Sequence, residues 1–118
     1  MENKEKLVDL SNMVNYQNAC KKYAVYPKEY KILYPSLGIC GEAGEVADKV
    51  KKVVRDKGGV FSEETKEEIA KEIGDVLWYC AILSDNLGYS LDDIANMNLN
   101  KLESRYQRNK LSGSGDNR

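Results

Sequence analysis

Residues 62–88, SEETKEEIAKEIGDVLWYCAILSDNLG, have the features of one long amphipathic helix and thereby decide the fold class. Ser62 is a favourable N-cap residue, and the acidic residues after it lie in the first turn, where the helix dipole favours negative charge. Apolar residues then recur at helical spacing until Gly88, which can end the helix. The predicted core face comprises Ile69, Ile73, Val76, Leu77, Cys80 and Leu83.

A second helix is predicted immediately upstream. It begins near Pro35 and Ser36, because proline is tolerated in the first turn, and it ends before Gly58-Gly59. Its apolar residues follow one another at steps of three and four, which places them on one face of the helix. This second predicted core face comprises Leu37, Cys40, Ala43, Ala47, Val50 and Val54.

Two more helices complete the predicted architecture. The first runs from about Leu7 to Tyr23, and the connector from Ala24 to Lys31 contains a proline. The last begins at Ser90, has Asp93 three residues later in a near capping box, and continues towards Lys110. Because no segment shows the alternation of a strand, we expect an all-α fold, a bundle of four to five helices.

Length and composition limit the classes of protein. A chain of 118 residues suits one domain, predicted at residues 1–110, followed by a disordered Gly/Ser-rich tail at residues 111–118. The formal net charge of −1 gives no reason to expect binding to nucleic acid or to an anionic membrane. The longest apolar run, Val76 to Leu83, is too short to span a membrane. Three scattered cysteines and no visible secretory signal predict reduced thiols and a cytoplasmic location.

Histidine is absent, which excludes Ser-His-Asp and Cys-His hydrolases, histidine-ligated zinc sites and di-iron bundles built on Glu-x-x-His. Carboxylates are the remaining notable groups. Glu42 and Glu45 lie three residues apart on the second helix, and Glu72 and Asp75 lie three apart on the third. Each pair borders the apolar face of its helix, so we expect the two pairs to meet across the helix pair.

Converging carboxylates need a counter-charge. Two carboxylates about 5 Å apart repel by roughly 3 kcal/mol at an effective dielectric of about 20. Mg²⁺ suits ligation by carboxylate oxygens and keeps positions open for substrate phosphates, so the acids indicate phosphoryl chemistry. Taken alone, either pair is more readily explained as a solvated helix surface. Glycines beside the acids, at Gly41, Gly44 and Gly74, favour either close helix packing or a bound ligand, since glycine is costly inside a helix.

The segments GICGEAGEVAD (residues 38–48) and EIGDVLWY (residues 72–79) together resemble the MazG-like all-α nucleoside triphosphate pyrophosphohydrolases. That family carries Glu-x-x-Glu on one helix and Glu-x-x-Asp on the next, separated by a variable spacer. The resemblance extends to Asn98, Lys101 and Arg105, which match a common family ending on the last helix. It covers about residues 14–108 and is nearest to the short phage and bacterial members.

The resemblance implies Mg²⁺-dependent hydrolysis of a (deoxy)nucleoside triphosphate to the monophosphate and pyrophosphate, in the role of cleaning the nucleotide pool, with Mn²⁺ as a substitute metal. It implies that one Glu of the site is the general base. The implied metal ligands and catalytic residues are Glu42, Glu45, Glu72 and Asp75. The implied substrate contacts are Tyr79, Asn98, Lys101 and Arg105.

Weaker substrate candidates come from the residues themselves. Lys52 is a candidate for phosphate binding and is equally well explained as a surface lysine. Tyr16 and Gln17 are candidates for contacting a base, with ordinary helix packing as the alternative. Trp78 lies within an apolar run and is better explained as a core residue or a subunit contact.

Two other functions stay open at this point. A phosphoribosyl-ATP pyrophosphohydrolase uses similar helices and metal on a different substrate, and a non-catalytic helical interaction module would carry its acids as surface features. Four helices of this length bury limited surface, and the resemblance implies a site shared between subunits. We therefore expect a homodimer or a dimer of dimers.

Overall fold

The computed structural model describes residues 12–118, and these residues form an all-helical fold without strands. Within them, the all-α prediction is confirmed. The α1–α2 connection contains two single 3-10 turns, η1 (Lys21–Tyr23) and η2 (Lys28–Tyr30). The four α-helices are α1 (Met13–Cys20), α2 (Leu33–Asp56), α3 (Glu63–Asn86) and α4 (Leu91–Gln107).

Capping residues begin and end α3, and begin α4, close to where the sequence predicts. The Ser62 side chain accepts a hydrogen bond from the backbone N–H of Thr65 at 3.2 Å, which begins α3. Gly88 follows the end of α3 with a φ of 89°, in the left-handed region that glycine tolerates best. Ser90 and Asp93 form a complete capping box at the start of α4.

The first and last helices each end earlier along the chain than predicted. The α-helical part of the first is Met13–Cys20, and the chain then tightens into η1, ahead of Pro27, which disfavours helical backbone at the residue before it. The predicted beginning at Leu7 lies outside the described residues. The last helix ends at Gln107 rather than near Lys110, because Asn109 adopts a left-handed φ of 57°.

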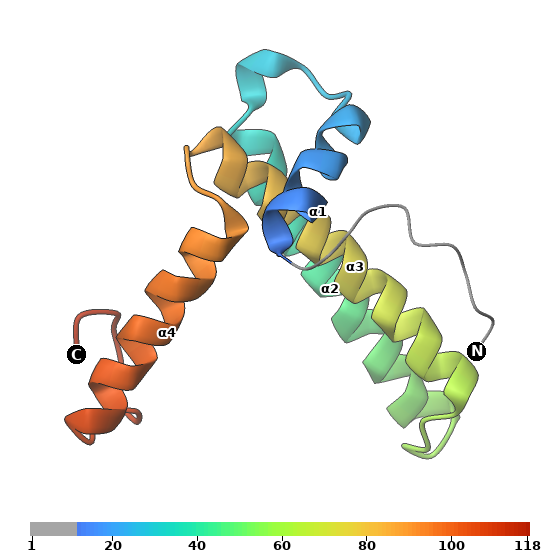
Figure 1. The fold of residues 1–118 in the computed structure, drawn as a ribbon. Coiled ribbons are helices and arrows are strands. Elements are labelled where there is room, and N and C mark those ends of the chain that lie inside the picture. The colour runs from blue at the N-terminus through green and yellow to red at the C-terminus, as the bar shows by residue number, and fades with distance from the viewer. Residues whose placement is uncertain (1–11) are drawn as a thin grey trace.

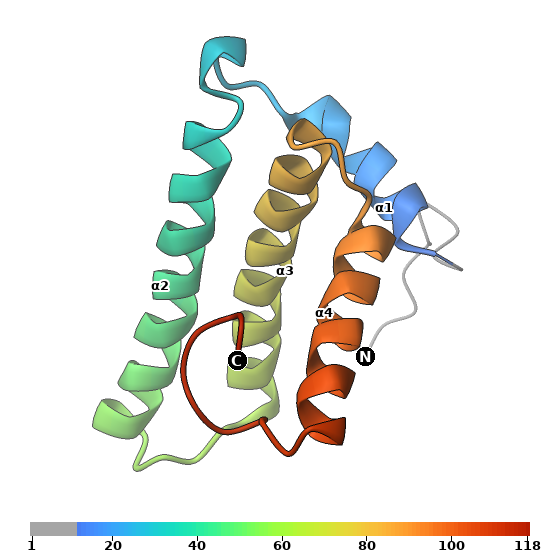
Figure 2. The ribbon, with the colours of Figure 1, turned by 90° about the vertical axis from the view of Figure 1, so that its left-hand side faces the viewer.

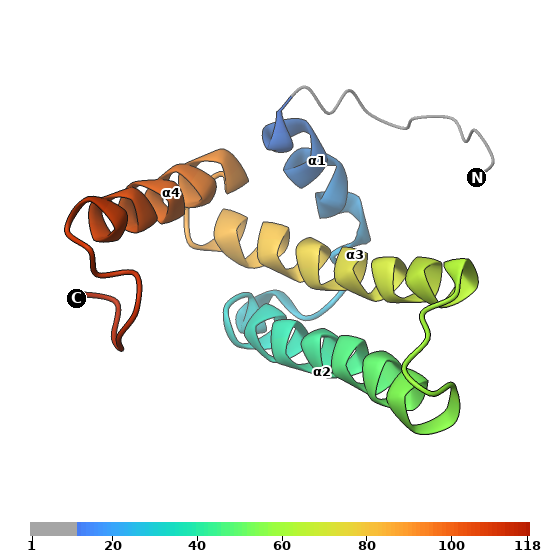
Figure 3. The ribbon, with the colours of Figure 1, turned by 90° about the horizontal axis from the view of Figure 1, so that it is seen from below.

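The helices α2 and α3 pack side by side as an antiparallel hairpin, and α4 diverges from this hairpin (Figure 1). The connection between α2 and α3 is at the lower end of the pair in Figure 2. Helix α1 lies on the side of α3 away from α2 (Figure 3). The described chain therefore has an open shape in which α4 shares little surface with α2.

The core lies where α1, the end of α3 and the start of α4 meet. Gln17 ties these helices together and is only 3% exposed. Its Nε2 donates to the backbone oxygens of Ala81 and Tyr89, both at 3.0 Å, and its Oε1 accepts from the backbone N–H of Leu91 at 3.2 Å. The buried apolar residues of this core are Cys20, Ala81, Ile82 and Leu91.

The predicted core face of α2 is largely uncovered, and the prediction that it is buried is wrong for the single chain, whereas the predicted face of α3 is partly covered. Leu37 and Val54 of α2 are 62% and 64% exposed, whereas the buried residues of that helix are Pro35 and Val53. On α3, Ile73 is more than half exposed. The physical reason is the divergence of α4, because periodicity identifies an apolar face but does not say which element covers it.

No helix among the described residues combines the length and the apolar character needed to cross a membrane.

Candidate metal centre

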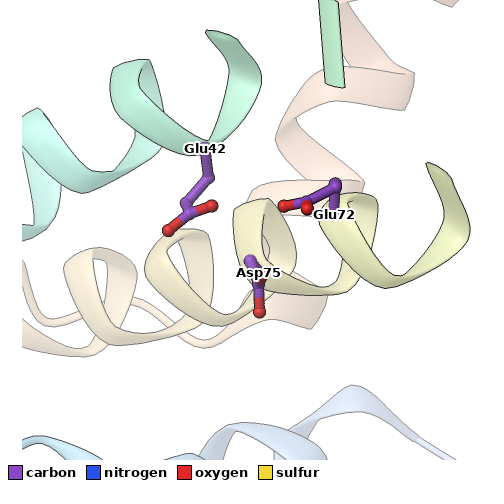
Figure 4. A group of neighbouring side chains, drawn as sticks. All are labelled: Glu42, Glu72 and Asp75. Atoms are coloured by element: carbon purple, nitrogen blue, oxygen red, sulfur yellow. The ribbon is translucent and has the colours of Figure 1, made fainter. Parts of the chain in front are cut away.

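Three carboxylates from two helices converge in the α2–α3 hairpin (Figure 4). Glu42 belongs to α2, whereas Glu72 and Asp75 belong to α3. One oxygen from each carboxylate lies within 4.8 Å of the other two. The spacing of three residues places Glu72 and Asp75 on neighbouring positions of one helix face, and the antiparallel packing brings Glu42 to that face. We call these three residues the acidic cluster.

Glu45, the fourth predicted ligand, lies beside the acidic cluster. Its side chain is exposed, and its carboxylate is outside the set of oxygens that approach within 4.8 Å. Its charge nevertheless reaches Glu42. Partial desolvation raises the pKa of Glu42, and the charges of Asp75, Glu72 and Glu45 raise it further.

The acidic cluster has no cationic partner in the part of the chain that the structure describes. The ion pairs there join Lys and Arg side chains to other acids, such as Asp48, Asp85 and Asp116. Like charges held close together without neutralisation are unfavourable, and a cation ligated by carboxylate oxygens relieves them. The donor set therefore fits a hard divalent cation.

Tyr79 lies one turn after Asp75 and joins the acidic cluster to a group of aromatic side chains. Its ring packs edge-on against Trp78, with 4.9 Å between ring centroids, and lies 6.4 Å from the ring of Tyr34. Tyr34 in turn stacks on Tyr26 at 4.7 Å. Desolvation raises the pKa of Tyr79, as do Tyr34, Glu42 and Asp75.

The predicted phosphate-binding residues lie on α4, apart from the acidic cluster in the single chain. Asn98 and Lys101 line a shallow groove of about 280 Å³ together with Ile94 and Met97. Arg105 lies one turn further along the same helix. Because α4 diverges from the hairpin, the fold does not bring this groove to the acidic cluster within one chain (Figure 1).

Asp116 of the C-terminal segment pairs with two basic side chains of α4. Lys101 donates to the Asp116 carboxylate at 3.2 Å, and Arg105 donates to the Asp116 backbone oxygen at 2.7 Å. Arg105 is only 4% exposed, and its Nε has no hydrogen-bond partner. Lys101 first and Arg105 second hold the pKa of Asp116 below its ordinary value. The sequence places Asp116 in a flexible tail and gives no signal for these contacts.

The weaker sequence candidates have structural partners. Lys52 pairs with Asp48 at 2.8 Å. Gln17 is buried, with both ends of its amide engaged in the core as described above, and Tyr16 packs against the same core. Trp78 also packs there, as expected, and donates from its indole nitrogen to the backbone oxygen of Cys20 at 3.3 Å. These contacts account for the side chains without a substrate.

Comparison with known proteins adds a family to this geometry. Residues 35–109 match the MazG nucleotide pyrophosphohydrolase domain family. The Gene 37 protein of Mycobacterium phage L5 is 44% identical over 109 residues, which cover 87% of this chain and 96% of that protein. The uncharacterized protein YvdC of Bacillus subtilis is 37% identical over 71 residues, or 56% of this chain and 67% of that protein. No solved structure matches the chain significantly.

Proposed function

The chain belongs to the MazG nucleotide pyrophosphohydrolase family, and from this premise we propose that it hydrolyses a (deoxy)nucleoside triphosphate to the monophosphate and pyrophosphate. The observation that carries the proposal is the acidic cluster, in which Glu42, Glu72 and Asp75 converge without a cationic partner. A role in removing unwanted nucleotides from the cytoplasmic pool is consistent with this activity.

Mg²⁺ is the proposed metal, with Mn²⁺ as a substitute. Glu42, Glu72 and Asp75 would hold it, and Glu45, one helical turn after Glu42, is proposed to join them through a change of side-chain rotamer. When bound, the ion neutralises the acids and polarises the phosphate oxygens of the substrate.

The side chains around the acidic cluster have separate tasks in this proposal. A glutamate of the site accepts a proton from the water whose oxygen attacks the α-phosphorus, and the bond from that phosphorus to the bridging oxygen breaks. Pyrophosphate leaves with the electrons of that bond. Tyr79 contacts the nucleotide beside the acids, and Lys101 and Arg105 stabilise the charge that develops on the leaving group.

This division of tasks requires a second copy of the chain. The basic residues of α4 lie away from the acidic cluster of their own chain, whereas exposed apolar side chains line both the hairpin and α4. Examples are Leu37 on α2 and Met97 and Leu99 on α4. We infer a homodimer, or a dimer of dimers, in which α4 of one chain reaches the hairpin of the other.

The direct test incubates the purified chain with a panel of canonical and modified dNTPs and Mg²⁺ and measures the products. We expect monophosphate and pyrophosphate in equal amounts, and no turnover in EDTA. Release of inorganic phosphate would contradict attack at the α-phosphorus. Turnover of phosphoribosyl-ATP alone would identify the related enzyme class, and calorimetry without any Mg²⁺ or nucleotide binding would identify an interaction module.

A further inference from the structure

Gly38 of α2 lies directly against the ring of Tyr79 on α3. A methyl group built at position 38 would lie 2.5 Å from Cζ of Tyr79 and nearer still to Cδ1 and Cε1, where real Cβ atoms are not found. The ring thus fills the space that any side chain at position 38 would occupy. The other glycines near the acids differ, because a methyl group would meet nothing within 4 Å at Gly41, Gly44 or Gly74.

The contact between Gly38 and Tyr79 lies next to the acidic cluster along the hairpin. Gly38 precedes Glu42 by one helical turn, and Tyr79 follows Asp75 by one turn. Since the two helices are antiparallel, the glycine–tyrosine contact and the carboxylate contact are successive layers of the same interface. The separation of the backbones in one layer therefore constrains the separation in the other.

The ring has little freedom to move away from a larger residue at position 38. Trp78 packs against it at 4.9 Å in an edge-on arrangement, and Tyr34 lies beside it at 6.4 Å. Tyr34 is itself stacked on Tyr26, with 11° between the ring planes. Closely packed side chains resist displacement, so an added methyl group would instead move α2 relative to α3.

We propose that Gly38 is a positioning residue for the metal centre: by letting the Tyr79 ring pack on the α2 backbone, it sets the distance at which Glu42 faces Glu72 and Asp75. Gly38 touches neither substrate nor metal in this role and acts through Tyr79. The inference rests on the proposed function only where it implies an effect on hydrolysis. Metal binding by the acidic cluster is measurable without substrate.

The test is a double-mutant cycle on Mn²⁺ binding. Electron paramagnetic resonance measures the Mn²⁺ affinity of the full chain in the absence of nucleotide. Gly38→Ala should lower Mn²⁺ affinity about tenfold, the scale typical of residues that orient metal ligands. Gly41→Ala, the matched control on the same helix, should leave affinity unchanged. Tyr79→Ala removes the ring, so the Gly38→Ala/Tyr79→Ala double variant should bind Mn²⁺ no more weakly than Tyr79→Ala alone.

Alanine favours helix more than glycine does, so weakened binding in Gly38→Ala would not come from a frayed α2. If circular dichroism shows that Gly38→Ala does not fold, Tyr79→Ala keeps the test open, because loss of the ring should by itself weaken Mn²⁺ binding severalfold. Three outcomes would each overturn the inference. The first is unchanged Mn²⁺ affinity in both single variants, and the second is a wild-type chain that binds no Mn²⁺. The third is a Gly38→Ala substitution that lowers the affinity as much in the Tyr79→Ala background as in the wild type.

Pyrophosphate release is measured on the same proteins and answers a different question. One outcome is that the effects of the substitutions at positions 38 and 79 on Mn²⁺ affinity are coupled while the wild-type chain hydrolyses no nucleotide. This would support the role of Gly38 and reject the proposed function. The opposite outcome is that the wild-type chain hydrolyses nucleotide while the substitutions at positions 38 and 79 affect Mn²⁺ affinity independently. This would support the proposed function and reject the role of Gly38.

Discussion

The carboxylates of Glu42 on α2 and Asp75 on α3 approach each other within 4.8 Å, although each helix carries other acids that remain in solvent. Such a like-charge contact is unfavourable for the metal-free chain and favourable once a divalent ion lies between the oxygens. Stability and activity should therefore respond to the same residues in opposite directions, as the first two predictions describe.

Asp75→Asn should reduce pyrophosphate release by at least about 100-fold, because a ligand matters at least as much as the residues that orient it. The neutral amide keeps the size of the side chain, so helicity by circular dichroism should not change. Glu68→Gln, on the same helix and outside the acidic cluster, is the matched control and should retain wild-type activity. Full activity in Asp75→Asn would reject the ligand assignment.

Glu42→Gln should stabilise the metal-free protein, with a melting temperature roughly 2–3 °C above wild type at pH 7 in EDTA. Desolvation first, and then the charges of Asp75, Glu72 and Glu45, raise the pKa of Glu42, so the charge that the variant removes is unfavourable in the folded metal-free chain. The sign follows from protonation: below that raised pKa, wild-type Glu42 is itself neutral, so the advantage of the variant should disappear as the pH falls.

In Mg²⁺ the order of stabilities should invert, because the wild-type chain gains binding free energy that the amide cannot supply. Differential scanning fluorimetry with EDTA or with Mg²⁺ measures both conditions. A Glu42→Gln variant that is less stable than wild type in EDTA would contradict the repulsion argument.

Asp116→Asn should lower the KM for a triphosphate by about two- to fivefold, the range expected when an exposed ion pair no longer competes. The Asp116 carboxylate lies 3.2 Å from Lys101 Nζ and 3.4 Å from Arg105 Nη2 in the structure, and in the proposed function substrate phosphates require the same two cations. Steady-state kinetics measure the change, with Ser114→Ala as the tail control. A KM equal to that of wild type would show that the tail contact does not compete with substrate.

Leu37→Glu should separate the proposed homodimer and abolish the proposed pyrophosphate release. Leu37 is 62% exposed in the single chain, so the monomer should tolerate a charge there. Burial of that charge against the apolar surface of a second chain would be unfavourable. Analytical ultracentrifugation measures the oligomeric state. Val25→Glu places the same charge on a more exposed apolar residue of the α1–α2 connection and should leave the dimer intact. A Leu37→Glu variant that stays dimeric would place the interface elsewhere.

Local features were the most predictable part of this fold. Ser62, Gly88 and Ser90 act within one turn of the backbone, so their sequence neighbours were enough to locate both ends of α3 and the start of α4. Three of the four acids were predictable for a similar reason, because a spacing of three residues fixes the face of a helix, whereas the carboxylate of Glu45 lies outside the cluster. That Glu42 meets Glu72 and Asp75 follows from two such faces in one hairpin.

Contacts that depend on the relative placement of whole helices were not predictable. Leu37 and Val54 carry the periodicity of buried residues, but the divergence of α4 leaves them uncovered. The role of Gly38 was equally hidden, because nothing in its neighbourhood along the chain indicates that the Tyr79 ring lies against it. Asp116 reaches Arg105 only because the chain turns back after α4.

The uncovered apolar residues of the hairpin have a consequence for how the total activity depends on the amount of protein that is synthesised. In the proposed homodimer each working unit is the product of an encounter between two chains, so at low abundance the number of such units would rise with the square of the number of chains synthesised. In that regime, doubling the production of the chain would quadruple the number of proposed dimers and, with it, the rate of the proposed hydrolysis.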